Sequence, residues 1–298
     1  MTSGNKAQDE DPETPHRVVD LLSRRIELRR RDFIALGAAT GVGALLAIEG
    51  FAREPSDVEL TVCDVRLPPG SGPRTPVKIL QISDLHFRRF RSRERNLVAL
   101  AKQADADIIV WTGDLIEKRF YAPGCMRLVA EVVGRTRSLA VQGNWEHWAG
   151  VAGKRIRKML REVGVQLLIN ESAGVSVRGF PIQFVGVDDA SVGYDSLPLA
   201  LRNARKDEFS FLLSHAPVLL PEAAAERMDL VLAGHTHGGQ ICLPVIGALR
   251  LPPGSGKYVS GEYREGKTLM YVNRGIGTTI IPARLFCRPE LTLFKLRT

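Results

Sequence analysis

The chain has 298 residues, of which 44% are hydrophobic and 25% are charged. This composition is ordinary for a globular protein and excludes a fibrous or wholly disordered chain, while the length suits one large domain, or two small ones, plus a tail. The formal net charge is +8. The first 52 residues hold 7 Lys and Arg and 8 Asp and Glu, which leaves 34 against 25, or +9, on the rest. This basic excess suits nucleic acid, anionic lipid and phosphorylated small molecules equally well.

The first 52 residues are predicted to form a separate segment. Residues 1–29 are polar, mixed in charge and without apolar periodicity, which predicts disorder. An arginine-rich stretch then precedes the apolar residues 33–48. These 16 residues are fewer than the roughly 20 that span a hydrocarbon core. A basic region before a short apolar one is typical of an export signal.

Residues 30–34, Arg-Arg-Asp-Phe-Ile, are similar to a twin-arginine signal, which directs folded proteins across the bacterial inner membrane. Arg29 departs from that pattern, because this position usually holds Ser or Thr. Gly50 and Ala52 are small enough to mark a cleavage point. We therefore expect residues 30–52 to be a signal read by the twin-arginine export machinery, which places the protein in the periplasm or cell envelope. The alternative is an uncleaved anchor that holds the protein at the inner membrane, facing the cytoplasm.

Residues 53–298 are predicted to form one domain. Apolar runs predict strands over 58–67, 77–83, 107–112 and 138–143, and helical spacing predicts helices over 93–104, 125–133 and 154–163. After Gly164 the pattern indicates only short strands, over 165–171, 175–179, 182–189, 210–215, 229–235, 268–275 and 291–296. Helix-bearing strand units followed by many short strands favour an α/β fold, a four-layer α/β/β/α sandwich in which two facing mixed sheets carry flanking helices.

Seven side chains that could ligate a metal follow the apolar runs of this domain. They are Asp84, His86, Asp114, Asn144, His215, His235 and His237. Strand ends present functional side chains because the sheet is rigid while the following loop leaves room for a ligand. Oxygen and imidazole donors without a thiolate suit manganese, iron(II) or zinc. Seven donors exceed one tetrahedral site but suffice for two ions that share a bridge, so the sequence predicts a centre of two divalent metal ions.

These residues lie in five blocks: Asp84-Leu85-His86, Gly113-Asp114, Gly143-Asn144, His215 and Gly234-His235-Thr236-His237. Their order and spacing resemble the five blocks of the calcineurin-like metallophosphoesterases, and the resemblance covers nearly all of residues 77–298. Residues 271–296 are similar to a bacterial membrane-linked subgroup that includes twin-arginine-exported proteins. The resemblance implies a metal-dependent hydrolase of phosphodiester or pyrophosphate bonds.

The resemblance also implies a role for each ligand. Asp84, His86 and His237 would hold one ion. Asn144, His215 and His235 would hold the other, and Asp114 would bridge the two. Cations roughly 3.5–4 Å apart bind a phosphoryl group on two oxygens and acidify a water for attack on it. Asp114 and Asn144 are therefore expected to be catalytic, Asn144 through a neutral oxygen that keeps the site positive for an anionic substrate.

One position departs from the family. The third block commonly reads Gly-Asn-His followed by an acid, and the family gives that His the role of protonating the leaving oxygen. Here Trp145 takes its place, and an indole N–H cannot deliver a proton near neutral pH. Either His147 reaches in as the catalytic acid or the enzyme works without one. Because a phosphate departs readily without protonation and an alkoxide does not, the second alternative favours pyrophosphate-linked or otherwise activated diesters.

Four residues are predicted to contact a phosphate-containing substrate, which we expect to be lipid-linked or nucleotide-linked. Arg88 and Arg89 begin a run of five arginines, over 87–95, suited to a phosphate or to the surface of an anionic membrane. A solvated helix start is the alternative. Trp145 suits a base or an acyl chain, or simply packs beside the metals. Arg274 suits the phosphate, although a turn is the plainer interpretation.

Several alternatives limit the functional prediction. The run lacks the spacing of a helix-turn-helix or RNA-binding motif, so specific nucleic-acid recognition is not expected. The second candidate function is a catalytically weak metal-binding scaffold, which the Trp145 replacement favours and the full set of seven ligands opposes. Cys242 is a candidate ligand, although a small buried side chain is the preferred interpretation. Asp188 and Asp189 follow a strand without belonging to a motif, and we expect them at the surface.

Overall fold

The computed structural model describes residues 40, 41 and 43–298. The chain divides into two units, Met1–Leu45 and Leu46–Thr298, and the fold below is that of the second. The predicted disordered residues 1–29 and the twin-arginine-like residues 30–34 lie outside the described part. Helical backbone at residues 46–48 leads into η1 (Glu49–Arg53) and η2 (Glu54–Ser56). In the part of the chain that the structure describes, every helix is too short or too polar to cross a membrane.

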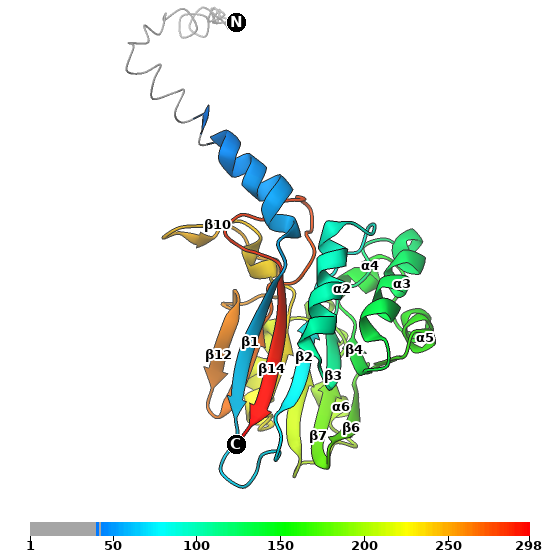
Figure 1. Ribbon diagram of the computed structural model, residues 1–298. Helices are drawn as coiled ribbons and strands as arrows, with labels where there is room; N and C mark the ends of the chain where they lie inside the picture. The colour runs from blue at the N-terminus through cyan, green and yellow to red at the C-terminus, as the bar shows by residue number, and fades with distance from the viewer. Residues whose placement is uncertain (1–39, 42) are drawn as a thin grey trace, which may run out of the picture. The chain divides into compact units, whose positions relative to one another are not determined.

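Two six-stranded sheets form the centre of the second unit (Figure 1). The first sheet contains, in order, β1 (Glu59–Arg66), β14 (Glu290–Arg297), β2 (Val77–Ile82), β3 (Ile108–Thr112), β4 (Arg137–Val141) and β5 (Val165–Leu167). The second contains β12 (Gly261–Glu265), β13 (Thr268–Val272), β9 (Leu230–Ala233), β8 (Phe209–Leu213), β7 (Phe180–Gly186) and β6 (Glu171–Val177). Both sheets are mixed, because β14 is antiparallel to β2, and β6 and β12 are antiparallel to their neighbours.

Helices cover the outer face of each sheet. The first sheet carries α2 (Ser92–Ala104), α3 (Ala122–Val133), α4 (Asn144–Trp148) and α5 (Lys154–Glu162) on its side, and the second carries α6 (Leu197–Ala200) and α7 (Leu220–Ala225). Helix α3 begins with Pro123 in its first turn, which suits a proline because the first N–H groups have no partner within the helix. The predicted four-layer α/β/β/α sandwich is confirmed.

The alternation of side chains along the central strands explains why these strands are apolar throughout. In β3, Ile108 and Val110 point into the space between the sheets, while Ile109 and Trp111 pack against the helices. Strands buried on both faces read as continuous apolar runs rather than as an alternation. The ladder that links β3 to β2 and β4 is parallel. The carboxyl ends of the central strands therefore meet at one edge of the sandwich.

The structure corrects three local predictions. Residues 165–171 were expected to form one strand, but the chain leaves the first sheet after β5, turns at Asn170 (φ 53°) and enters the second sheet as β6. Only strands were expected after Gly164, yet α6 and α7 form there. Helices of four and six residues are too short to show a helical period in the sequence. Strand β12 was also missed, because its charged sequence lacks the apolar signal of a strand.

Candidate metal centre

Seven side chains from both sheets meet at the edge where the parallel strands end. They are Asp84 and His86 after β2, Asp114 after β3, Asn144 after β4, His215 after β8, and His235 and His237 after β9. Each is at most 5% exposed. The structure thus brings together all seven predicted ligands, although they span more than half of the chain.

Three of these residues, Asp84, His86 and His237, form what we call the first half-site. The Nε2 atoms of the two histidines lie 3.1 Å apart, and His237 Nε2 lies 3.3 Å from Asp84 Oδ1. The donor atoms of all three lie within 4.8 Å of one another. This spacing allows one cation to touch all three.

The second half-site contains Asn144, His215 and His235. Asn144 Oδ1 lies 3.1 Å from His215 Nε2 and 3.1 Å from His235 Nδ1. The two imidazole nitrogens are themselves 3.1 Å apart. Three donor atoms again face one small space.

Asp114 lies between the half-sites. Its Oδ2 atom is 3.5 Å from His86 Nε2 and 3.2 Å from His215 Nε2, so one oxygen faces both groups. The other oxygen, Oδ1, accepts a hydrogen bond of 2.9 Å from the Trp145 backbone N–H. Asp114 is therefore the carboxylate that links the two groups of candidate ligands.

The protonation of these groups suits divalent cations. Burial lowers the pKa of His86 to about 4 and that of His237 well below its usual value, so both imidazoles are neutral with a lone pair available. Burial opposes a charge on His215, but Asp114 outweighs it and raises the His215 pKa well above its usual value. A cation bound there has to displace that proton. The set of imidazole, carboxylate and amide donors fits divalent cations.

The backbone around the ligands adopts a rare conformation. Five of the seven are non-glycine residues with positive φ: Asp84 (50°), His86 (41°), Asp114 (55°), His235 (71°) and His237 (52°). Such conformations cost free energy and concentrate at functional sites. Here they turn each side chain inward directly after its strand. A scaffold optimised for stability alone has no reason to place five of them around one space.

Two glycines leave the space that these side chains need. A Cβ on Gly234 would lie 1.9 Å from Ser83 Oγ and 2.4 Å from Asp84 Oδ2. A Cβ on Gly113 would lie 2.6 Å from His215 Nδ1, and its φ of +92° also disfavours a side chain. Both glycines therefore position ligands rather than merely permit a turn.

Glu146 organises the centre without being among its predicted residues. Its buried carboxylate accepts hydrogen bonds from the backbone N–H groups of Asp114 (2.9 Å), Leu115 (2.7 Å), Ile116 (2.9 Å) and Gly143 (2.8 Å). Burial raises the pKa of Glu146 to about 7, while these backbone donors act in the opposite direction. The carboxylate joins the loop after β3 to the loop after β4. The acid that follows the third sequence block was the signal that could have identified it.

His147 lies in a different environment from the one expected of a catalytic acid. Its Nε2 atom lies 2.8 Å from Asp188 Oδ1 and 3.1 Å from Gln142 Nε2, and its ring stacks on Tyr194. The hydrogen bond to Asp188 raises the pKa of His147. His147 is not among the residues that line the cavity above the ligands. The prediction that Asp188 and Asp189 lie at the surface is wrong, because both are buried and hold this part of the loop structure through hydrogen bonds.

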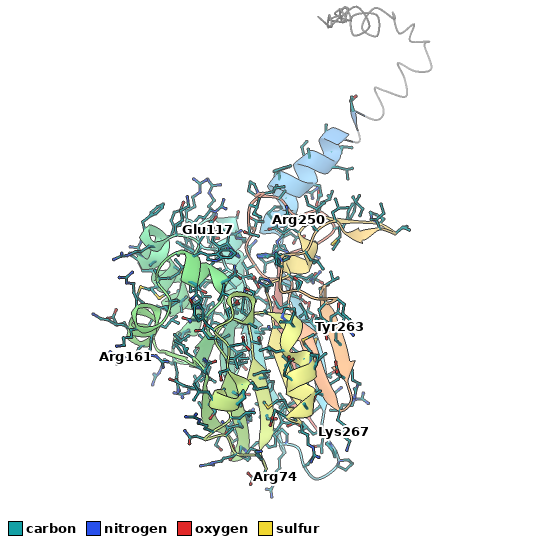
Figure 2. The ribbon with its side chains drawn as sticks, turned by 180° about the vertical axis from the view of Figure 1, so that it is seen from behind. Arg74, Glu117, Arg161, Arg250, Tyr263 and Lys267 are labelled. Carbon is teal, nitrogen blue, oxygen red and sulfur yellow. The ribbon has the colours of Figure 1, made fainter. Side chains whose placement is uncertain are left out.

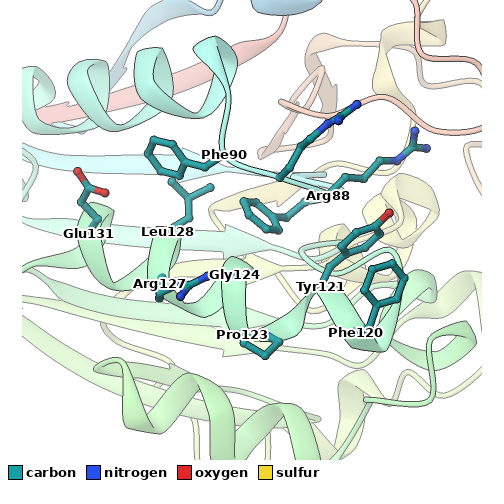
Figure 3. Close-up of a pocket in the computed structure, with 11 residues that line it drawn as sticks. Arg88, Phe90, Phe120, Tyr121, Pro123, Gly124, Arg127, Leu128 and Glu131 are labelled. Atoms are coloured by element: carbon teal, nitrogen blue, oxygen red, sulfur yellow. The ribbon is translucent and has the colours of Figure 1, made fainter.

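The predicted arginines are held by acidic partners or lie outside the centre. Arg88 forms a two-bond ion pair with Glu117, one bond of which measures 2.7 Å. Arg274 donates to Glu290 (3.1 Å) and Glu59 (3.1 Å). Arg89 is exposed and lines a second cavity of about 680 Å³. Figure 3 shows this cavity, with Arg88 and Phe90 among the residues that line it. None of the seven predicted ligands lines that cavity.

The cavity above the ligands has a volume of about 390 Å³. Its polar floor includes Asp114, Asn144, His235 and His237, and its walls are largely apolar, with Trp145, Trp148, Ile241, Leu249, Leu251, Ile280 and Ile281. The Trp145 ring also packs edge-on against His86, with 5.3 Å between ring centroids. Cys242 lies outside the ligand set, and its thiol donates to the Gly238 carbonyl (2.9 Å). All four cysteines are free thiols.

The sequence profile of the calcineurin-like phosphoesterase family matches residues 77–239. The chain belongs to this family. YkuE of Bacillus subtilis, described as an uncharacterized metallophosphoesterase, is 31% identical to this family member over 91% of this chain and 99% of its own length. Phosphodiesterase YaeI of Escherichia coli is 29% identical over 74% of this chain and 82% of its own length.

A third relative is a Bos taurus protein described as a transmembrane protein with metallophosphoesterase domain. It is 29% identical over 93% of this chain, which spans only 64% of that longer protein. The resemblance noted from the five sequence blocks is confirmed. This calcineurin-like phosphoesterase is therefore a metal-dependent hydrolase of phosphoester bonds, and its clustered Asp and His residues are candidates to hold the divalent metal.

Proposed function

We propose that this phosphoesterase uses two divalent metal ions to hydrolyse phosphodiester or pyrophosphate bonds. The observation that carries the proposal is the single Asp114 oxygen that faces both half-sites, at 3.5 Å from His86 and 3.2 Å from His215. Two bound cations would neutralise phosphoryl charge and acidify water. The protein supplies the rest: Asn144 contributes a neutral oxygen, which keeps the site positive, and the largely apolar walls of the cavity surround the phosphoryl group.

We propose further that no side chain protonates the leaving group. Trp145 occupies the position of the family's acid, and His147 hydrogen-bonds to Asp188 rather than lining the cavity. An alkoxide leaves slowly without a proton, whereas a phosphate leaves readily at neutral pH. Substrates with a good leaving group, such as pyrophosphate-linked or aryl diesters, should therefore be preferred.

A leaving-group series tests this second step. The rate on aryl phosphodiesters should rise steeply as the pKa of the leaving phenol falls. Trp145→His should raise the rate on alkyl diesters while changing the rate on pyrophosphate-linked substrates little, and Trp145→Phe serves as the control for lost packing. A rate that stays constant along the series would contradict the absence of an acid.

The alternative function, a catalytically weak metal-binding scaffold, is separated by a simple assay. The purified chain reconstituted with manganese should hydrolyse a generic aryl phosphodiester, and the Asp114→Ala variant should not. Equal, near-background rates in both proteins, with two metal equivalents bound to the wild type, would favour the scaffold. The five inward-turned ligands with positive φ support the enzyme, because a scaffold has little need of such costly geometry.

For the natural substrate we propose a lipid-linked or nucleotide-linked phosphate compound. The apolar cavity walls and the indoles of Trp145 and Trp148 would accept an acyl chain or a base. A panel of phospholipids, UDP-acylated sugars and nucleotide diesters distinguishes the two classes. We also retain export to the cell envelope as a proposal. The relative named as a transmembrane protein supports a location at a membrane, and fractionation of cells that express the full chain tests it.

A further inference from the structure

Large apolar side chains are exposed on the loops around the mouth of the cavity above the metal centre. The hairpin formed by β10 (Cys242–Leu243) and β11 (Gly247–Ala248) carries Val245 and Ile246 at its tip, where they are 108% and 71% exposed. The loop before β14 carries Ile280, at 77% exposure, and Phe286, at 56%. Monomeric proteins rarely gather so many apolar side chains on one surface without a function.

The backbone holds three of these side chains outward at a cost. Val245 (φ 72°), Ile280 (φ 61°) and Phe286 (φ 52°) all adopt the left-handed conformation. For β-branched residues such as Val and Ile this is a genuine outlier, since the branched Cβ crowds the backbone. The exposed side chains find no packing inside the protein that would offset this cost. A contact outside the protein is the reason that fits.

The apolar surface is continuous with the wall of the cavity. Leu249, Ile280 and Ile281 line the cavity and are also 55%, 77% and 46% exposed. Trp148 on α4 lines it as well and is 65% exposed. An apolar chain that lies on the rim could therefore enter the cavity without crossing a polar belt.

The N-terminal segment of the second unit is attached to the same loop. The Arg284 backbone N–H donates to the Gly50 carbonyl (2.8 Å), and the Phe286 N–H donates to the Glu54 carboxylate (2.8 Å). Within that segment, Ile48 and Phe51 are 56% and 59% exposed. Residues 48–54 of the second unit therefore lie beside the loop that carries Ile280 and Phe286.

A basic side chain accompanies the apolar ones. Arg250 follows the exposed Leu249 and lines the same cavity, is itself exposed, and forms no ion pair with the residues that the structure describes. Figure 2 shows Glu117 and Arg250 at one end of the unit, opposite Arg74 and Lys267. Exposed apolar tips next to a cation fit a surface that enters an anionic lipid interface, whereas a protein–protein interface is depleted in charge at its core.

We propose that the tip of the β10–β11 hairpin and the loop over residues 276–288 dock this face on an anionic phospholipid bilayer, so that the metal centre takes amphiphilic phosphate substrates directly from it. The substrate part of this inference rests on the proposed function, while the docking itself does not. The acyl part of the substrate would lie along Leu249, Ile280 and Ile281 and its phosphate above the half-sites.

The test uses the full chain, loaded with manganese, and quenching of tryptophan fluorescence by bromine-labelled acyl chains. The chain has three tryptophans, and subtracting the emission of a Trp148→Phe variant from that of the wild type gives the emission of Trp148. Vesicles of phosphatidylglycerol and phosphatidylcholine should quench Trp148, and vesicles of phosphatidylcholine alone should do so less. This readout reports contact of the face itself, even when the N-terminal segment also holds the chain on the vesicle.

A double variant, Val245→Asp with Ile246→Asp, should remove most of the quenching and lower the rate on a vesicle-embedded diester about tenfold. Its rate on a soluble aryl diester should stay at the wild-type value, which also shows that it folds. Val62→Asp, on an exposed part of β1, is the matched control and should change neither readout.

Each failure has a separate meaning. Unquenched Trp148 in both kinds of vesicle, with soluble-diester hydrolysis intact, overturns the docking and leaves the proposed function standing. A wild type that is quenched but hydrolyses no diester overturns the proposed function instead. If the double variant changes the oligomeric mass and leaves quenching unaltered, the face binds a protein copy and the bilayer proposal is wrong.

Discussion

The two half-sites differ in how their histidines are held. In the second half-site, His215 Nδ1 lies 2.7 Å from the Thr112 carbonyl and His235 Nε2 lies 2.7 Å from the Pro253 carbonyl. Each of these nitrogens must carry a proton, so the opposite nitrogen is the one that can bind a metal, on His215 once the proton that Asp114 stabilises has left. In the first half-site, the Nδ1 atoms of His86 and His237 are buried without a hydrogen-bond partner.

This difference bears on metal affinity. An outer hydrogen bond fixes the tautomer and orientation of an imidazole ligand and raises its basicity, and its loss typically costs 10–100-fold in affinity. Hydrogen bonds orient the imidazoles of the second half-site before a metal binds, whereas the Nδ1 atoms of the two imidazoles of the first have no such partner. We therefore expect two unequal ions: a tightly held one at Asn144, His215 and His235, and a looser one at Asp84, His86 and His237.

The largest effect is expected from removing Asp114, the residue that the two half-sites share. Asp114→Ala deletes the oxygen that lies 3.5 Å from His86 and 3.2 Å from His215, so the rate on an aryl phosphodiester should fall by at least about 1,000-fold. Metal analysis should show that both ions are lost, or that the two ions no longer bind cooperatively. Asp105→Ala, an exposed aspartate at the end of α2, is the matched control. A variant that keeps more than a tenth of the wild-type rate would exclude the bridging role.

A chelator titration measures the difference in metal affinity between the two half-sites directly. The wild type should lose one metal equivalent at a chelator concentration about 10–100-fold lower than the second. His86→Ala should retain only the late step and His235→Ala only the early one, as measured by elemental analysis after each addition. Two simultaneous steps in the wild type would show that the missing outer partners do not matter.

Glu146→Gln probes the element that both half-sites depend on. The amide keeps the shape but offers one oxygen instead of two to four backbone N–H groups, so it should destabilise the fold by about 2 kcal/mol. It should also lower the rate about tenfold through a displaced Asp114. Glu162→Gln, on the exposed face of α5, is the control in both thermal unfolding and kinetics. An unchanged melting temperature would contradict the supporting role of Glu146.

The smallest effect is expected for the ion pair between Arg274 and Glu290. Burial opposes a charge on Glu290, but Arg274 and the Tyr271 hydroxyl outweigh it and lower the Glu290 pKa below its usual value of 4.5. A lowered carboxyl pKa stabilises the fold above the usual value and loses this contribution as the pH falls through the lowered one. As the pH falls from above 4.5 through the lowered pKa of Glu290, the wild type should therefore lose more unfolding free energy than Glu290→Gln.

Denaturant titrations at each pH measure that difference. Glu162→Gln, at an exposed position on α5, is the control variant in the same titrations. Parallel curves for Glu290→Gln and the wild type would mean that the pair contributes nothing to the pH dependence of stability. Arg274 packs against the loop of His237, since a Cβ on Gly238 would lie 2.9 Å from Arg274 Cγ. The metal affinity of the first half-site should therefore also be measured in Glu290→Gln.

The fold class, the family and the seven candidate ligands could all be predicted from the sequence alone. Each of these signals is local: an apolar run marks a buried strand, and the polar residue that ends it lies where parallel strands open. Asp84 after β2 and His235 after β9 could therefore be identified without knowing that their loops meet. The short helices α6 and α7 escaped, because four to six residues contain too little periodicity.

The residues that surround these ligands could be identified only from the tertiary structure. Glu146 contacts a backbone N–H 32 residues away, and Arg274 contacts Glu59 across 215 residues. The turn of His147 toward Asp188 and the exposure of Val245 likewise depend on how distant loops pack. Such contacts leave no periodic trace in the chain, because long-range packing sets which neighbour each side chain meets, whereas local hydrophobicity sets only where a strand or helix can form.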